Sequence, residues 1–133
     1  ELYNAGKIPL TEFVDRKKDN DILVNIIVKK QPLRVCYMSQ RNTKTDFPVL
    51  TCAAAKTEAG YRFSIGARPG KAVLFELADA DIQAADVENM AENAAKCVKE
   101  QVETGSNTRG SAEYRKHLAG VLVRRAVCKL AGK

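Results

Sequence analysis

Few side chains in this 133-residue chain have the type and spacing that acid–base or nucleophilic chemistry needs. His117 is the only histidine, and Glu113 stands four positions before it, so both lie on one face of a helix. Such a pair is more often a surface contact, worth roughly 0.2–0.5 kcal/mol, than a catalytic dyad. Ser64 and Ser111 have no base near them in the sequence, although a fold could bring His117 close to either. These residues alone therefore predict no autonomous active site.

The only glycine-rich loop, residues 66–70 (GARPG), does not have the spacing of a phosphate-binding loop. The pattern G-x-x-x-x-G-K-[ST] requires one more residue between the glycines and a hydroxyl after the lysine, whereas Ala72 follows Gly70-Lys71 here. The loop does not match G-x-G-x-x-G either. We therefore expect a turn that leads from strands to helices.

The four cysteines, at positions 36, 52, 97 and 128, form no C-x-x-C pair, and a single histidine cannot complete a zinc cluster with them. Their even number would permit disulfides, but no segment near the start has the order of a secretory signal. Each cysteine lies in an apolar stretch. We therefore expect four reduced, largely buried thiols, no metal in this chain and a cytoplasmic protein.

The positive charge is concentrated near the C-terminal end. Residues 107–133 contain seven of the 22 basic residues and one of the 16 acidic ones, so this stretch alone accounts for the net charge of +6. A basic helix could bind nucleic acid or an anionic surface, but cations near a helix C-terminus also complement its dipole. No aromatic residues alternate with these cations as a stacking platform would require, which favours a solvated helix face. No apolar run approaches the roughly 18–20 residues of a membrane span.

Segments with the pattern of strands occupy the first half of the chain. The β-branched run at residues 21–30 (DILVNIIVKK) predicts a first strand, and residues 33–40 predict a second. Residues 51–65 predict a β-hairpin around a glycine-containing turn. Residues 71–78 fit either a short helix or an edge strand. The first twenty residues have the composition of a linker, which would make residues 21–133 the folded domain.

Two long helices follow the strands. Apolar residues repeat with a period of 3.6 over residues 86–102, and Ser111 is placed to cap a second helix that ends near Leu130, with Gly132 just beyond it. Strands followed by helices predict an α+β fold. We expect an antiparallel sheet of three or four strands with about three helices packed on one face.

Four segments, in order along nearly the whole chain, carry a family pattern. They are residues 8–13 (IPLTEF), 45–50 (TDFPVL), 64–69 (SIGARP) and 107–126 (NTRGSAEYRKHLAGVLVRRA). Together they resemble the C-terminal domain of the FAD-binding subunits of molybdenum hydroxylases, the group of xanthine dehydrogenase and carbon monoxide dehydrogenase. Asn107 stands where aspartate is usual in that family.

The resemblance implies a part of a larger oxidoreductase. Its fold would be an α+β sandwich, with residues 71–78 as the first helix. The parent enzymes pass electrons from a molybdenum cofactor through iron–sulfur clusters to FAD and then to an acceptor. FAD would be held mainly by N-terminal lobes whose glycine-rich loops are not in this sequence, so we expect the chain alone to be non-catalytic and to bind FAD weakly or not at all. The expected partners are those lobes and the iron–sulfur and molybdenum-cofactor subunits, with no membrane.

The same resemblance implies a flavin-proximal loop that closes one side of the flavin pocket. Its candidate cofactor-binding residues are Tyr37, Ser39, Gln40, Arg41, Lys44 and Asp46. Many family members have a lysine two residues after the aromatic residue, where Ser39 stands here, so Arg41 or Lys44 would have to supply the positive charge. The alternative is an ordinary solvated loop. The alternative function is a basic interaction module that binds nucleic acid or a partner subunit through the C-terminal helix.

Overall fold

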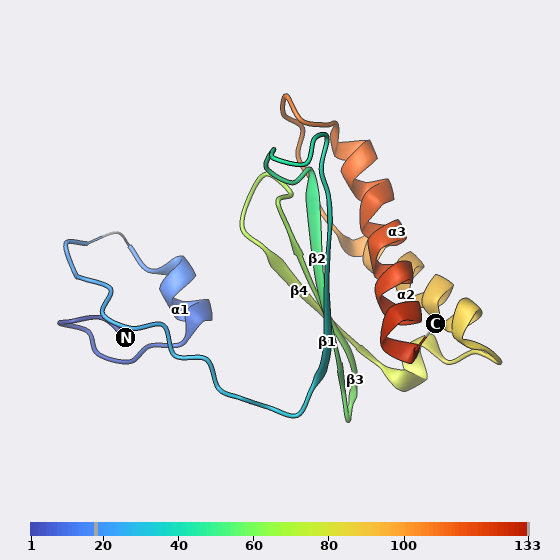
Figure 1. Cartoon of the computed structure of the whole chain (residues 1–133), viewed down its shortest axis with the longest axis horizontal. Coiled ribbons are helices and arrows are strands. Elements are labelled where there is room, and N and C mark those ends of the chain that lie inside the picture. The colour runs from blue at the N-terminus through green and yellow to red at the C-terminus, as the bar shows by residue number, and fades with distance from the viewer. Residues whose placement is uncertain (18, 133) are drawn as a thin grey trace. The chain divides into compact units, whose positions relative to one another are not determined.

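A computed structural model describes residues 1–17 and 19–132 of the chain, which divides into two compact units, Glu1–Pro32 and Leu33–Lys133. The second unit contains a four-stranded antiparallel sheet whose strands are neighbours in the order of the sequence (Figure 1). Its strands are β1 (Arg34–Gln40), β2 (Leu50–Thr57), β3 (Gly60–Gly66) and β4 (Val73–Ala78). The predicted α+β fold with an antiparallel sheet followed by helices is confirmed.

One face of the sheet is buried and the other is open. In β2 and β3 the buried side chains alternate with partly exposed ones, as the period-two pattern of a half-buried strand requires. The register places Cys52 opposite Ile65 and Ala54 opposite Phe63, and all four side chains are buried in the core. The predicted hairpin is therefore confirmed, including its turn before Gly60.

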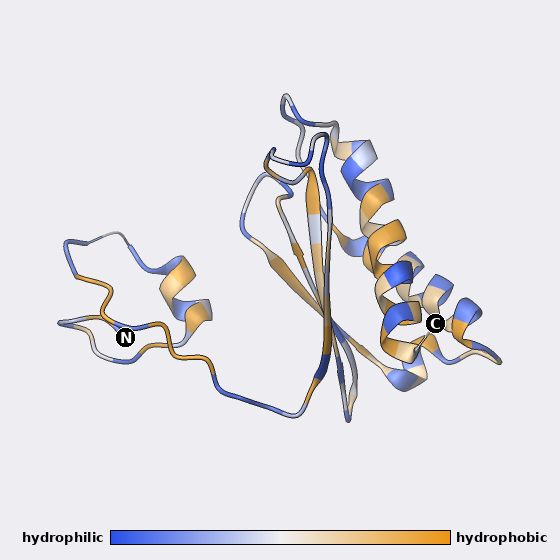
Figure 2. Ribbon diagram, in the orientation of Figure 1, coloured by the Kyte–Doolittle hydropathy of each residue, from blue (hydrophilic) through white to orange (hydrophobic). Residues whose placement is uncertain are grey.

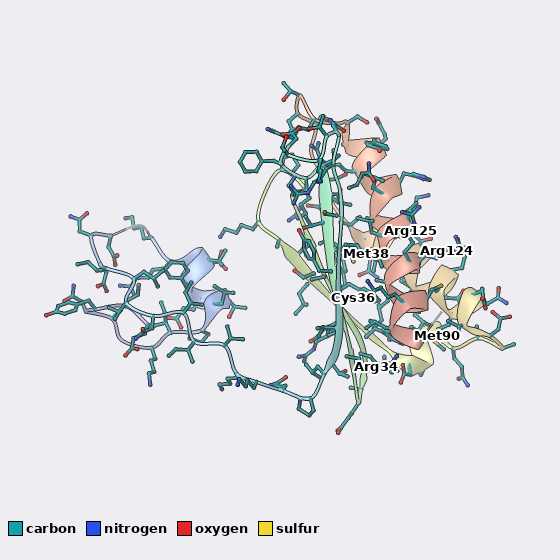
Figure 3. All side chains as sticks on the ribbon, viewed as in Figure 1. Arg34, Cys36, Met38, Met90, Arg124 and Arg125 are labelled. Carbon is teal, nitrogen blue, oxygen red and sulfur yellow. The ribbon has the colours of Figure 1, made fainter. Side chains whose placement is uncertain are left out.

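Two helices cover the buried face of the sheet (Figure 1). Helix α2 (Val87–Gln101) begins after Asp86, and α3 (Ala112–Ala131) begins after Ser111; in each case the side chain of the preceding residue accepts a hydrogen bond from the first turn. Hydrophobic and hydrophilic residues alternate along both helices (Figure 2). The apolar residues of both helices pack into one core with the sheet. Cys36 and Met38 of β1 lie on this helix-covered side, whereas Arg124 and Arg125 lie on the exposed surface of α3 (Figure 3).

The strand predicted for residues 21–30 is not formed. These residues belong to the unit Glu1–Pro32, and no strand is assigned to them. They take part in one isolated bridge, between Leu2 and Leu23. Their β-branched side chains favour a strand locally, but a strand also needs a neighbouring one for its backbone hydrogen bonds. The same unit contains one short helix, α1 (Leu10–Asp15), within the segment that composition assigned to a linker.

The helix that the resemblance implied for residues 71–78 is also wrong, because most of this segment forms the edge strand β4. Phe75 and Leu77 pair with Phe63 and Tyr61 of β3 and face the core, while Leu74, Glu76 and Ala78 are exposed. This alternation has a period of two, which a helix would not satisfy. A 3-10 turn, η1 (Asp79–Ile82), follows β4 and buries Ile82.

All four cysteines are free thiols, and those of Cys36 and Cys52 are buried. Among the described residues, no group of three or more histidine, cysteine or acidic side chains is arranged to hold a metal ion. No described helix combines the length and the hydropathy that a membrane crossing requires.

The buried thiol of Cys52 makes the protein less stable in alkali. Burial, with a smaller contribution from nearby Cys36, raises the pKa of the Cys52 thiol from 9.0 to about 12. Above about pH 9 the unfolded chain loses this proton and the folded chain keeps it, so the free energy of unfolding decreases as the pH rises. We expect this thiol to contribute a loss of about 1 kcal/mol between about pH 8 and pH 10, measured by urea unfolding.

The variant Cys52→Ala isolates that contribution. It should show a shallower decline with pH than the wild-type chain, although it is less stable throughout because it leaves a cavity. Equal slopes in the two proteins would contradict the prediction.

Candidate functional site

Three loops gather at one end of the sheet, at the top of Figure 1. They are the β1–β2 loop (residues 41–49), the β3–β4 loop (67–72) and the α2–α3 loop (102–111), and together we call them the loop end. Three of the four family-like segments lie in or beside these loops. Segments that are far apart in the sequence therefore meet at one place in the fold.

Arg115, in the first turns of α3, connects this helix to two of these loops. Its side chain is fully buried. Its Nε donates to the carbonyl of Val49 at 2.9 Å, and Nη1 donates to the carbonyls of Gly105 at 2.6 Å and Gly110 at 2.5 Å. Its Nη2 donates to Oδ1 of Asn107 at 2.5 Å. One side chain thus satisfies four acceptors that belong to the β1–β2 and α2–α3 loops.

The guanidinium of Arg115 has no acidic partner among the described residues: its recorded partners are three backbone carbonyls and the amide oxygen of Asn107. Burial, followed by the positive charge of Arg109, lowers the pKa of Arg115. The charge pattern placed Arg115 on a solvated helix face, and the structure shows that this was wrong. Its i,i+3 and i,i+7 spacing with the apolar residues Leu118 and Leu122 is the signal that could have identified it as buried.

A second arginine, Arg109, holds the β1–β2 loop against the α2–α3 loop. Its Nε lies 3.2 Å from Oδ1 of Asp46, and its guanidinium carbon lies 5.3 Å from the centre of the Phe47 ring. Asn42 donates to the carbonyl of Arg109 at 3.2 Å, and Arg41 donates to the carbonyl of Asp46 at 2.5 Å. The loop that contains Arg41, Lys44 and Asp46 is therefore held both by a local bond and by contacts with Arg109, which is more than 60 positions away.

The β3–β4 loop is held in the same way by Arg68. Its Nη1 donates to the carbonyl of Glu103 at 2.6 Å, and its own carbonyl accepts from the amide of Gly105 at 3.1 Å. A side chain at position 105 would approach Pro69 to 3.2 Å, so glycine permits this close contact. The α2–α3 loop is thus bonded to both of the other loops.

The structure separates the six predicted site residues into two groups. Tyr37 and Ser39 lie within β1 on the open face of the sheet, opposite Ala53 and Thr51, and are not part of a loop. Gln40 ends the strand. The other three, Arg41, Lys44 and Asp46, lie in the β1–β2 loop.

The open face has a shallow hollow of about 430 Å³ beside Tyr37, whose side chain is 60% exposed. Short side chains form its floor, and longer ones border it; the lining includes Tyr37, Ala53, Ala55, Arg62, Ser64 and Leu74. Arg62 is held at this face by an ion pair with Glu76, at 2.6 Å. Sequence reasoning did not identify the hollow, although the alternation in β2 and β3 indicated which residues would face outward.

The same fold occurs in solved molybdenum hydroxylases. Quinoline 2-oxidoreductase from Pseudomonas putida 86 matches with a TM-score of 0.66 and 23% identity over 76% of this chain and 38% of its own. A carbon monoxide dehydrogenase from Hydrogenophaga pseudoflava that lacks the Mo-pyranopterin moiety matches with a TM-score of 0.68 and 21% identity, over 84% of this chain and 42% of its own. A Cu,Mo-CO dehydrogenase matches with a TM-score of 0.59 and 20% identity, over 77% and 38%. These likenesses show that the chain has the α+β fold of a domain in these enzymes.

The chain belongs to the CO dehydrogenase flavoprotein C-terminal domain family, whose sequence profile matches residues 36–130. The resemblance drawn from the four segments is therefore confirmed. No curated protein matches the sequence. The chain spans about two fifths of the length of the solved chains that it resembles, and residues 1–35 precede the part that the family profile matches.

Proposed function

We propose that this chain is the C-terminal domain of the FAD-binding subunit of a molybdenum hydroxylase-type dehydrogenase, and that it closes one side of the flavin pocket. Family membership supports a flavoprotein domain. The observation that carries the proposed role is the exposed ring of Tyr37 beside a hollow with a floor of small side chains. The parent subunit would pass electrons from molybdenum, through iron–sulfur clusters, to FAD and an acceptor.

The hollow has the features that one face of a planar ring requires. Its volume lies within the roughly 300–1,000 Å³ typical of ligand sites. Ala53, Ala55 and Ser64 have short side chains, so a flat group could approach the sheet closely. Tyr37 offers an aromatic face, and a stacked aromatic pair is worth about 0.5–1.5 kcal/mol. The hollow is open on one side, so other parts of the subunit would have to cover the rest of the ring.

The polar residues at the end of β1 would form hydrogen bonds with the edge of that ring. Ser39 and Gln40 are donors and acceptors, and Ser39 lies on the same face of β1 as Tyr37. We assign the positive charge that the family usually takes from lysine to Arg41, because its bond to the carbonyl of Asp46 holds it in the loop. A cation here would stabilise the negative charge that a flavin gains on reduction. FAD supplies the redox chemistry when it is bound.

The described residues offer no glycine-rich cradle for the FAD pyrophosphate, which supports the proposal that the N-terminal lobes of the same subunit provide it. The further partners that we propose are the iron–sulfur and molybdenum-cofactor subunits. We place the parent enzyme in the cytoplasm, because its C-terminal domain has four free thiols.

The alternative, a nucleic-acid-binding helix, is less well supported by the arrangement of charges. Arg115 is buried, and Arg124 lies 3.5 Å from Glu92. Burial thus removes one cation from the surface of α3, and an ion pair offsets the charge of another. Binding that falls steeply with rising salt would be the signature of phosphate contacts and would favour this alternative.

Replacing Tyr37 tests the proposed flavin contact. In the full subunit, we expect Tyr37→Leu to weaken FAD binding by about two- to tenfold and to shift the flavin absorbance bands, because it removes an aromatic stack of about 0.5–1.5 kcal/mol. Titration of the apoprotein with FAD, followed by flavin fluorescence, measures both effects. Tyr114→Leu, a half-exposed tyrosine of α3, is the matched control and should bind FAD as the wild type does. Unchanged affinity and spectra in Tyr37→Leu would contradict the assignment.

A further inference from the structure

The unit Glu1–Pro32 exposes a continuous run of large apolar side chains. Six of the seven residues from 22 to 28 (ILVNIIV) are apolar and between 51% and 81% exposed. Single exposed apolar residues are normal at protein surfaces, but a contiguous group of this kind marks an interaction site. The run is therefore a surface that another structure is expected to cover.

The backbone of this run forms hydrogen bonds at one end only. The amides of Val24 and Asn25 donate to the carbonyl of Glu1, at 2.9 and 3.2 Å, and the amino group of Glu1 donates to the carbonyl of Asn25. Beyond that point, the described part of the chain shows no backbone hydrogen bond at residues 26–28. Their amides and carbonyls are free to join a sheet, because an extended segment can satisfy these groups by pairing with a strand.

Both sides of the run are apolar except at Asn25. In an extended chain, Ile22, Val24, Ile26 and Val28 point to one side, and Leu23, Asn25 and Ile27 point to the other. A strand at a solvated surface alternates apolar with polar residues, whereas a strand that is covered on both faces is apolar throughout. Lys29 and Lys30 end the run. The pattern is that of a strand inside a sheet that has a layer on each face.

We propose that residues 22–28 form a β-strand of a sheet in the part of the FAD-binding subunit that precedes this domain. On this view, the unit Glu1–Pro32 completes that preceding lobe, and the C-terminal domain begins near Leu33. This inference rests on the proposed function, which supplies the preceding lobes. Two observations support the preceding lobe as the structure that covers the run. The chain spans only 38–42% of the length of the solved chains, and the family match begins at residue 36.

Hydrogen exchange of the backbone amides tests this pairing directly. The amides of residues 26–28 should exchange at nearly unprotected rates in the 133-residue chain, and at least about a hundredfold more slowly in the full subunit, where the ladder would hold them. Rapid exchange at these residues in the full subunit would overturn the proposal. Slow exchange in the short chain, together with concentration-dependent dimers, would show that a second copy covers the run and would overturn it as well.

Substitution of the run provides a second readout. In the full subunit, replacing Ile26 and Val28 with lysine should abolish the protection of residues 26–28, whereas Leu10→Lys, at a similarly exposed position of α1, should preserve it. If the substituted subunit does not fold, the exchange rates of residues 26–28 in the wild-type subunit still show whether the strand is formed. The FAD content of the full subunit distinguishes this inference from the proposed function. If FAD is bound but the amides of residues 26–28 exchange rapidly, only the proposed strand is refuted. If these amides are protected but no FAD is bound, only the proposed flavin role is refuted.

Discussion

Arg115→Met is expected to lower the free energy of unfolding of the 133-residue chain by about 3–5 kcal/mol. Methionine has a similar length but no donors, so the carbonyls of Val49, Gly105 and Gly110 and the amide oxygen of Asn107 would lose their partner together. Each buried acceptor left without a partner costs about 1–3 kcal/mol, and part of this cost is recovered as the loops relax towards water. Urea unfolding followed by far-ultraviolet circular dichroism measures the change.

A buried charge can sometimes be exchanged for an apolar side chain without loss of stability, but only when its partners are exchanged too. That route is closed here, because three of the four partners of Arg115 are backbone carbonyls. Arg124→Met is the matched control: it removes an exposed arginine of the same helix and should cost at most about 1 kcal/mol. If Arg115→Met and Arg124→Met had equal effects, the four hydrogen bonds would contribute nothing to stability.

A substitution that strengthens one hydrogen bond of Arg115, instead of removing all four, is also informative. Asn107→Asp would place a carboxylate against the buried guanidinium, whose hydrogen bond from Nη2 already points to that position. We expect this variant to be about 1–2 kcal/mol more stable than the wild type at neutral pH, because a hydrogen bond between charged groups is stronger than one to an amide. The same unfolding experiment checks it.

Gly60→Ala should destabilise the chain by about 2–4 kcal/mol, because it combines backbone strain with a steric clash. Gly60 ends the turn between β2 and β3 with φ of +141°, a conformation that side chains rarely permit. A Cβ atom there would lie 2.1 Å from the carbonyl oxygen of Leu77 and 2.8 Å from Cα of Ala78. Both obstacles are backbone atoms of β4, so the strand itself would have to move.

Gly70→Ala separates the two causes. Gly70 has nearly the same φ, +140°, but a Cβ atom there would meet nothing closer than the end of the Arg68 side chain, at 4.0 Å. We expect only the strain of about 1 kcal/mol in this variant. The losses in free energy of unfolding of the two variants, measured by thermal and urea unfolding, should therefore differ by the cost of the clash. Equal losses would show that β4 moves aside without an energetic cost.

The helices and the central hairpin could be predicted from the sequence because their signals are local. Asp86 and Ser111 accept hydrogen bonds from amides three positions on, and Gly132 adopts the left-handed conformation just after α3. Each of these contacts lies within a few residues of chain, so residue type and spacing are sufficient. The alternation in residues 51–65 likewise depends only on which side chains a single strand presents to each face.

Two strand assignments required tertiary information. Residues 21–30 have strong β propensity, but a strand forms only where another strand supplies its hydrogen bonds, and residues 26–28 have none in the described structure. Residues 71–78 are too short for periodicity to separate a helix from a strand. Residues 73–78 form β4 because they pair with the edge of β3, where Phe75 lies opposite Phe63 and Leu77 opposite Tyr61.

By itself, the sequence determined the α+β class, the two capped helices, the hairpin and, through four ordered segments, the family. Only the tertiary structure decided how the candidate site is arranged. It buried Arg115, which charge counting had placed in solvent, and it set Tyr37 on the open face of the sheet instead of in a loop. The physical reason is that local propensities act over a few residues, whereas burial and pairing join residues that are far apart in the sequence. Arg115 and Val49, for example, are 66 positions apart.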